Sequence, residues 1–241
     1  LDFKTLQADG IAVANISDLN KIAVEIAVYR VGQRDAKYIV NGYLDDILTL
    51  LSAGSTRYVV STTKRTQGYL INIPFDGNIE LNSGDYIEVK VKAQTTAFTS
   101  LSVPNSDITI ETTPATVNNP QIAICELVSY TSGEININKA LGNNIARVVL
   151  LNDLSNNYGT STKSKPVNGI TLTGMGFDKV SSENALLNEN VLALQNNPET
   201  PVKALMVYNS SKLLHGAKFV AKYDKAVDAD AKIMVIRKEL V

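Results

Sequence analysis

The chain contains one histidine and one cysteine, so few of its side chains could carry acid–base or nucleophilic chemistry. His215 lies in the segment 212–216, which predicts a loop before a strand, and the sequence places no specific nucleophile or carboxylate beside it. Cys125 lies in the apolar segment 122–127, where a free cysteine packs as a small hydrophobic residue. No basic residue flanks it to favour a thiolate. We therefore expect both residues to be structural and the chain not to be an enzyme.

The densest acidic group comprises Asp224, Asp228 and Asp230. Carboxylates on flexible loops are ligands that Ca²⁺ takes, but this spacing lacks the glycine and the terminal glutamate of an EF-hand loop. We expect these aspartates to cap the backbone of a hairpin, with a structural Ca²⁺ site as the alternative. A single cysteine excludes a cysteine-based zinc cluster and an intramolecular disulfide. We assign no catalytic, cofactor-binding or metal-ligating residues.

Short glycine and lysine motifs do not predict a phosphate or nucleic-acid site. The segment 174–176 (GMG) lacks the strand–loop–helix context of a phosphate-binding loop, so a bulge or a close backbone approach explains it better. The basic residues at 64–65 and 163–165 fall in expected polar loops without interleaved aromatic residues and predict solvated turns. The net charge of −1 creates no basic field. We expect no direct sequence-specific binding of nucleic acid.

The composition and the periodicity indicate β-strands. Valine, isoleucine and threonine, which suit a pleated and half-buried surface, make up about a quarter of the chain. Segments 21–30 and 85–93 alternate between apolar and polar residues, which is typical of strands with one wet face. The turn 82–85 (NSGD) predicts a hairpin. The ten tyrosines, with no tryptophan, form no recognisable aromatic row, which argues against a carbohydrate-binding sandwich.

The expected elements are therefore mostly strands. A first series is expected near 11–16, 21–31, 36–42, 57–63, 68–75, 78–82, 85–94, 97–103 and 107–113, and a second near 121–131, 133–138, 144–153, 169–177, 202–209, 216–223 and 231–240. Helices are expected at 45–51 and 182–196. Because few helices separate the strands, a doubly wound α/β fold is disfavoured.

An uncharged segment with two prolines, 112–120, lies near the midpoint and predicts a linker. We expect one domain at 1–116 and another at 117–241. About 120 residues accommodate an eight-stranded jelly roll. The fold expected is all-β, with two tandem jelly-roll β-sandwiches and one or two short helices. A single large β-sandwich with insertions is the alternative.

Two short barrels, each interrupted by a late helix, resemble the double jelly-roll major capsid protein of tailless, membrane-containing icosahedral phages of the corticovirus and tectivirus type. The segments that carry the resemblance are 78–89 (NIELNSGDYIEV) in the first half, and the late helix with 216–223 and 231–240 in the second. The chain is short for this family, which implies short loops at the tops of the barrels. The resemblance implies a structural protein located in the virion.

A capsid building block requires a rigid β scaffold, flat lateral surfaces and near-neutral charge. We expect a homotrimer that contacts neighbouring capsomers, with minor capsid or membrane proteins beneath the shell as further partners. Segments 144–153 and 231–236 are apolar on both faces, so they must lie centrally in a domain or at an interface. A trimeric binding module, such as a spike, adhesin or lectin-like domain, is the alternative function. An enzyme on a β-sandwich ranks third.

Overall fold

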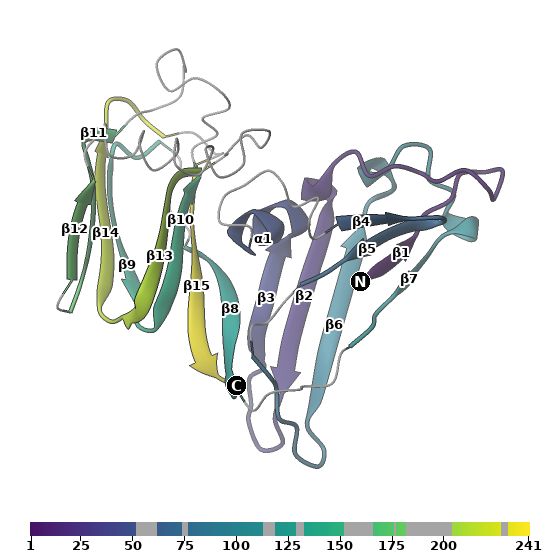
Figure 1. The fold of residues 1–241 in the computed structure, drawn as a ribbon, viewed down its shortest axis with the longest axis horizontal. Helices are drawn as coiled ribbons and strands as arrows, with labels where there is room; N and C mark the ends of the chain where they lie inside the picture. The colour runs from purple at the N-terminus through teal and green to yellow at the C-terminus, as the bar shows by residue number, and fades with distance from the viewer. Residues whose placement is uncertain are drawn as a thin grey trace. The chain divides into compact units, whose positions relative to one another are not determined.

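The protein is an all-β protein, as the sequence predicts (Figure 1). The computed structural model describes residues 1–51, 62–73, 77–112, 119–128, 133–151, 166–175, 177–181, 204–227 and 231–241. The expected helix 182–196 and the expected domain boundary at 116–117 lie outside these residues.

The chain divides into two compact units. The first comprises Leu1–Leu48, Tyr58–Ile124 and Leu240–Val241, and the second comprises Thr49–Arg57 and Cys125–Glu239. The division therefore falls inside a strand, between Ile124 and Cys125. Each unit contains its own antiparallel strand pairs and its own buried side chains.

The first unit contains two sets of paired strands. Its elements are β1 (Asp2–Lys4), β2 (Ile22–Tyr29), β3 (Lys37–Tyr43), β4 (Thr62–Arg65), β5 (Gly68–Ile71), β6 (Tyr86–Ala93) and β7 (Asp107–Thr109). One set has the order β4-β5-β1-β7, and the other has β3-β2-β6. Because β2 pairs with both β3 and β6, it lies centrally in its set. Its apolar residues Val24, Ile26 and Val28 are buried on the inner face.

The second unit contains two sheets with a different strand order. Its elements are β9 (Asn136–Gly142), β10 (Ile145–Leu151), β11 (Pro166–Gly174), β12 (Phe177–Ser181), β13 (Ala204–Leu214), β14 (Ala217–Tyr223) and β15 (Lys232–Leu240), entered through β8 (Gln121–Val128). The neighbours in one sheet are β13-β10-β15-β8, and those in the other are β12-β11-β14-β9. Successive strands along the chain therefore alternate between sheets at most steps.

The two sheets of the second unit pack face to face around one core. Inward residues of β9, β11 and β14, including Phe219 and Tyr223, pack against inward residues of β10 and β15. The pattern along β14 is strictly alternating, with every second residue buried. This packing makes the second unit a β-sandwich.

The two segments that are apolar on both faces form the middle of a sheet. β10 pairs with β13 on one side and β15 on the other. Val148, Val149 and Leu150 of β10 are at most 1% exposed, so both faces of this strand are covered. The prediction that these segments require cover on both sides is confirmed within the chain itself.

Helix α1 (Leu44–Leu51) confirms the helix expected at 45–51. Asp45 and Asp46 lie in its first turn, where negative charge is favourable to the helix dipole. At its other end the Arg147 guanidinium donates hydrogen bonds to the carbonyl oxygens of Leu50 and Leu51, at 2.9 and 2.8 Å. The last carbonyl oxygens of a helix are those that need hydrogen-bond donors outside it, and the arginine supplies donors to two of them.

Several strand predictions are wrong. Segments 11–16 and 97–103 form only isolated bridges, bends and short 3₁₀ turns, and 78–82 is not a strand. The turn at 82–85 is present, with the Asp85 N–H donating to the Asn82 carbonyl at 3.0 Å, but it does not join two strands as a hairpin. Segment 169–177 overlaps β11, which ends at Gly174, and reaches only the first residue of β12. The short strand β1 has no counterpart among the predictions.

Candidate functional site

His215 lies at a turn, as predicted. It is exposed, and it connects β13 to β14, which belong to different sheets. Its backbone carbonyl accepts a hydrogen bond from the Met175 N–H at 2.8 Å. Gly174 approaches the same carbonyl so closely that an added Cβ would lie 3.1 Å from it. The close backbone approach predicted for the glycines at 174–176 is therefore present at Gly174, while Gly176 lies outside the described residues.

Cys125 lies on β8, as predicted, and its side chain is partly buried. Burial raises the pKa of its thiol to about 12, although the nearby Arg147 charge acts in the opposite direction. A thiol with such a pKa carries almost no thiolate at neutral pH, and the thiolate is the nucleophilic form. Cys125 is therefore held as a protonated thiol at neutral pH.

The acidic group at 224–230 is described only in part. Asp224 lies in the bend that follows β14, and Asp228 and Asp230 lie outside the described residues. Within the described ranges, no cluster of three or more histidine, cysteine, aspartate or glutamate residues could hold a metal ion.

Of the two basic motifs expected in polar loops, the structure describes only one. Lys64 and Arg65 lie in strand β4, so the loop prediction for them is wrong, and 163–165 falls outside the described part of the chain. In the same described part, no helix is long and apolar enough to cross a membrane.

The outward face of β3-β2-β6 gathers four tyrosines, and we call it the tyrosine face. Its residues are Tyr29, Tyr38, Tyr43, Tyr86, Glu25, Asn41, Glu88, Lys90 and Lys92. Cross-strand register brings these side chains to one side, since Glu25 lies opposite both Asn41 and Lys90. Tyr38, Tyr43 and Tyr86 are 45%, 49% and 53% exposed. The register places Tyr29, Tyr38 and Tyr86 towards one end of this face and Tyr43 at the other, a gathering of tyrosines that the sequence did not predict.

A charged cluster lies at the centre of the tyrosine face. The Lys90 ammonium lies 2.7 Å from a Glu88 carboxylate oxygen and 3.1 Å from one of Glu25. These two carboxylates, Glu88 first, raise the pKa of Lys90, and the same contact lowers the pKa of Glu88. The Tyr29 hydroxyl donates to Glu88 at 3.0 Å, which raises the pKa of Tyr29. Exposed Lys92 lies on the same face, so the four charged residues of the tyrosine face sum to a net charge of zero.

Aromatic stacking and a shallow depression shape the rest of this face. The rings of Tyr29 and Tyr86 stack with their centroids 4.7 Å apart and their planes 6° from parallel. Near the other end, a depression of about 230 Å³ is lined by Ala23, Gly42 and Tyr43 together with polar and charged side chains that include Lys92. It is smaller than the pockets of about 300–1,000 Å³ that hold drug-sized ligands. It can accept one small side chain or ring.

The outward face of β9 and β14 in the second unit has the opposite character, and we call it the lysine face. Its residues are Lys218, Val220 and Lys222 of β14, together with Asn136, Asn138 and Ala140 of β9. Lys218 and Lys222 are exposed, and neither forms an ion pair within the described residues. Among the six residues of this face there is no aromatic ring and no carboxylate, so it carries two positive charges.

A buried aspartate holds the turn before β6 in the first unit. The Asp85 side chain is 3% exposed and lies 2.6 Å from the Arg30 guanidinium. It also accepts hydrogen bonds from the backbone N–H groups of Val31 and Asn82, at 2.8 and 2.9 Å. The hydrogen bond from Arg30, followed by those two backbone bonds, lowers the pKa of Asp85 to about 2.

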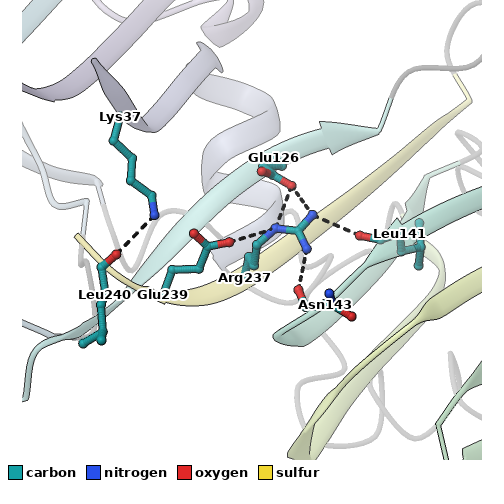
Figure 2. Close-up of polar contacts among 7 residues, drawn as sticks. All are labelled: Lys37, Glu126, Leu141, Asn143, Arg237, Glu239 and Leu240. Carbon is teal, nitrogen blue, oxygen red and sulfur yellow. Dashed lines mark hydrogen bonds and ion pairs between the residues drawn. The ribbon is translucent and has the colours of Figure 1, made fainter. Parts of the chain in front are cut away.

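Arg30 also supports this turn through backbone carbonyls. Its guanidinium donates to the carbonyl oxygens of Glu80 and Val241, both at 2.5 Å. The neighbouring Lys37 ammonium donates to the Leu240 carbonyl at 3.1 Å, as Figure 2 shows. The residues before β6 and the last residues of the chain are therefore held within the first unit.

Arg237 plays the corresponding part in the second unit (Figure 2). Its guanidinium donates to the carbonyl oxygen of Leu141 at 3.0 Å and to that of Asn143. It also donates two hydrogen bonds to one Glu126 carboxylate oxygen, at 2.5 and 3.1 Å. These contacts fix the turn between β9 and β10, where Gly142 has a positive φ of 85°.

Sequence reasoning identified the strands of both faces but not the faces themselves. The alternation in 21–30 and 85–93 places Tyr29 and Tyr86 on the polar sides of their strands. Which strands pair, and in which register, is a long-range property that a single sequence does not contain. The two arginine anchors carried no signal of their own, because each connects residues far apart in the chain.

The sequence matches no protein-family model, and a search of curated proteins finds no relative.

Proposed function

We propose that the chain is the major capsid protein of a virus, with three copies forming a capsomer of an icosahedral shell. The observation that carries this proposal is the strand order of the second unit. When the eight strands β8 to β15 are renumbered 1 to 8 in chain order, one sheet has the strand order 1-8-3-6 and the other has the order 2-7-4-5. This order is that of a jelly roll, a fold common in viral capsid domains.

The first unit supports the proposal less specifically. Its strands also form two sets, but β2 and β3 are consecutive and pair directly, so its order differs from that of the second unit. We propose that it is a variant of the same barrel. Two β units in one chain give a subunit with two lateral sides, and three such subunits make a block with six sides. Closed cyclic symmetry satisfies the contacts inside such a block and leaves its edges free for neighbouring capsomers.

The state of the two side chains that could carry nucleophilic or acid–base chemistry also supports the proposal. The single thiol is held protonated, and the single histidine lies exposed at a turn. We propose that the protein is located in the virion, where minor capsid or membrane proteins beneath the shell are further partners.

Electron microscopy of the particle from which the chain derives, or of concentrated purified protein, tests this function. The proposal predicts a shell or two-dimensional array of six-sided blocks on a hexagonal lattice. Filaments, or isolated single subunits at every concentration, would contradict it.

A binding module of the spike or lectin-like type is the second candidate, and one observation favours it. The depression beside Tyr43 is lined by an exposed aromatic ring and by polar groups of Glu25, Asn41 and Lys90, which is an arrangement suited to a small ligand. Binding of a glycan panel to the purified protein, lost on substituting Tyr43→Ala, would support this candidate over the capsid protein.

A further inference from the structure

We propose that strand β6 of one copy pairs with β6 of a second copy, antiparallel and in a single register, so that the two sheets become continuous across a two-fold axis. The partner is a second copy of this chain, and the contact is isologous because the same strand serves on both sides. In the proposed shell this pair joins one capsomer to its neighbour, and in that respect the inference rests on the proposed function.

The outer edge of β6 carries backbone groups that have no partner in the described part of the chain. β6 is the last strand in the order of its sheet, next to β2 (Figure 1). The Gln94 N–H donates to the Lys21 carbonyl at 3.1 Å where this pairing begins, so the even-numbered residues of β6 face β2 by the alternation of antiparallel ladders. The N–H and C=O groups of Ile87, Val89 and Val91 therefore point to the open side, where an added strand binds.

The inward row of β6 is also incompletely covered. Ile87, Val89 and Val91 lie opposite buried apolar residues of β2 that are at most 4% exposed, yet all three are only partly buried themselves. Along its eight residues β6 has no proline, no glycine and no bulge against β2, so it lacks several of the devices that protect an edge strand. A second strand at this edge covers the row and removes its apolar surface from water.

The outward side chains of β6 favour self-pairing in one register. When Val89 of one copy lies opposite Val89 of the other, Glu88 of each copy lies opposite Lys90 of the other copy. In the same register Tyr86 lies opposite Lys92. These are non-hydrogen-bonded positions, where facing side chains come closest, so they gain ion pairs and cation–π contacts. The two-fold axis forms each of these pairs twice.

Neighbouring registers place like charges together. A slip by one step in one direction sets Glu88 against Glu88, and a slip in the other direction sets Lys90 against Lys90. Like charges directly opposite each other destabilise a strand pair. A slip that sets odd-numbered against even-numbered residues leaves the free backbone groups without facing partners. Charges that commonly protect an edge from indiscriminate pairing therefore permit one register here.

Disulfide trapping tests this register, in a Cys125→Ala background so that the native thiol takes no part. Position 89 lies on the two-fold axis, where the Cα atoms of a hydrogen-bonded antiparallel pair are about 5.5 Å apart, within the range of about 4.4–6.8 Å that disulfides span. Val89→Cys should therefore form a covalent dimer under mild oxidation. Val91→Cys is the matched control on the same inward row. The two copies of position 91 are offset by about 13 Å along the strands, so this variant should remain uncrosslinked.

A backbone substitution tests the pairing without a new thiol. Val89→Pro removes an N–H that faces the open edge and keeps the bonds to β2, which is where an edge strand tolerates proline. In a sedimentation series up to millimolar concentration, self-association should weaken about tenfold or more, because two central hydrogen bonds between the copies are lost.

Asn138→Pro on β9, another edge strand, is the matched control for this substitution. The Ile135 carbonyl accepts from the Tyr223 N–H, so by alternation the Asn138 N–H faces away from β14. Asn138→Pro should leave the self-association unchanged. Thermal melting establishes that each variant is folded, and the cysteine pair decides the matter if Val89→Pro melts early.

Failure of this inference and failure of the proposed function give different results. If the wild type is trimeric and Val89→Cys stays uncrosslinked at millimolar concentration, the capsomer stands and the β6 pairing is wrong. Equal crosslinking of Val89→Cys and Val91→Cys, or unweakened association of a folded Val89→Pro, also overturns the pairing. If Val89→Cys crosslinks selectively while the wild type forms no trimer, the β6 pairing stands and the trimeric capsomer is wrong.

Discussion

The two units each hold a turn with one arginine that is largely buried, and they differ in where the partner carboxylate lies. Arg30 and Arg237 are 15% and 14% exposed, and each donates to two backbone carbonyls. In the first unit the partner Asp85 is 3% exposed and accepts two backbone N–H groups. In the second unit Arg237 pairs with Glu126, which is 41% exposed, and with Glu239, which is 29% exposed and lies 3.6 Å away.

This difference shows which charge organises each turn. In the first unit the carboxylate itself satisfies backbone donors, so the turn depends on an ionised aspartate. In the second unit the guanidinium itself donates the hydrogen bonds to the backbone carbonyls, and the carboxylates beside it mainly orient it. The first turn should therefore respond to acid, and the second should respond to loss of its arginine.

Arg237→Met should have the largest effect, a loss of about 3 kcal/mol in the free energy of unfolding. The substitution leaves the Leu141 and Asn143 carbonyls without the charged donor that they had, and hydrogen bonds to charged groups contribute about 1.5–3 kcal/mol each. Glu126→Gln is the matched control and should cost less than about 1 kcal/mol, because exposed ion pairs contribute little. Denaturant unfolding monitored by circular dichroism measures both. Equal losses for the two variants would contradict this division of roles.

Gly142→Ala should cost about 2 kcal/mol, because a residue with a side chain is strained at a positive φ. The added Cβ would also lie 3.1 Å from the Arg237 guanidinium nitrogen, so the anchor would have to shift. Gly133→Ala is the control, since its φ of 93° is similar but an added Cβ meets nothing within 4 Å. The same unfolding measurement should show a larger loss at 142 than at 133. A loss no larger at 142 would show that the guanidinium can move freely.

Asp85→Asn should destabilise the protein at neutral pH, by less than Arg237→Met but by more than Glu126→Gln. Because the pKa of Asp85 is lowered from 3.8 to about 2, its stabilisation is fully present above pH 3.8 and is lost as the pH falls through about 2. The stability difference between wild type and variant should therefore shrink across that interval. Denaturant midpoints from pH 6 to pH 2 measure it. A difference that stays constant with pH would mean that ionisation of Asp85 does not hold the turn.

The smallest effects are expected at the residues that sequence alone singled out for chemistry. Cys125→Ala should cost about 1 kcal/mol through lost packing, and His215→Ala less than about 0.5 kcal/mol, because its side chain is exposed. In the folded protein at pH 8, Cys125 should react with a thiol reagent far more slowly than in denaturant, since its pKa is raised to about 12. Rapid modification of the native protein would contradict a packing role.

Local patterns predicted much of the fold. The alternation in 21–30 and 85–93 matches β2 and β6, and the acidic first turn matches the start of α1. The strand predictions failed at 11–16 and 97–103. These segments are rich in residues that favour strands, but they form only isolated bridges, and a strand exists only when another strand pairs with it.

The candidate surfaces required information that local sequence does not hold. Tyr29 and Tyr86 are far apart in the chain and become neighbours only through the pairing of β2 with β6. The order 1-8-3-6 and 2-7-4-5 in the second unit, which carries the functional proposal, likewise results from long-range pairing.

The mass of the purified protein in solution tests the central claim most directly. Sedimentation equilibrium or light scattering at micromolar concentration should give three times the 26.1 kDa of one chain, and the trimer should persist on dilution. A stable monomer of 26.1 kDa across the dilution series and under particle-forming conditions would contradict a trimeric capsomer and favour the isolated binding module.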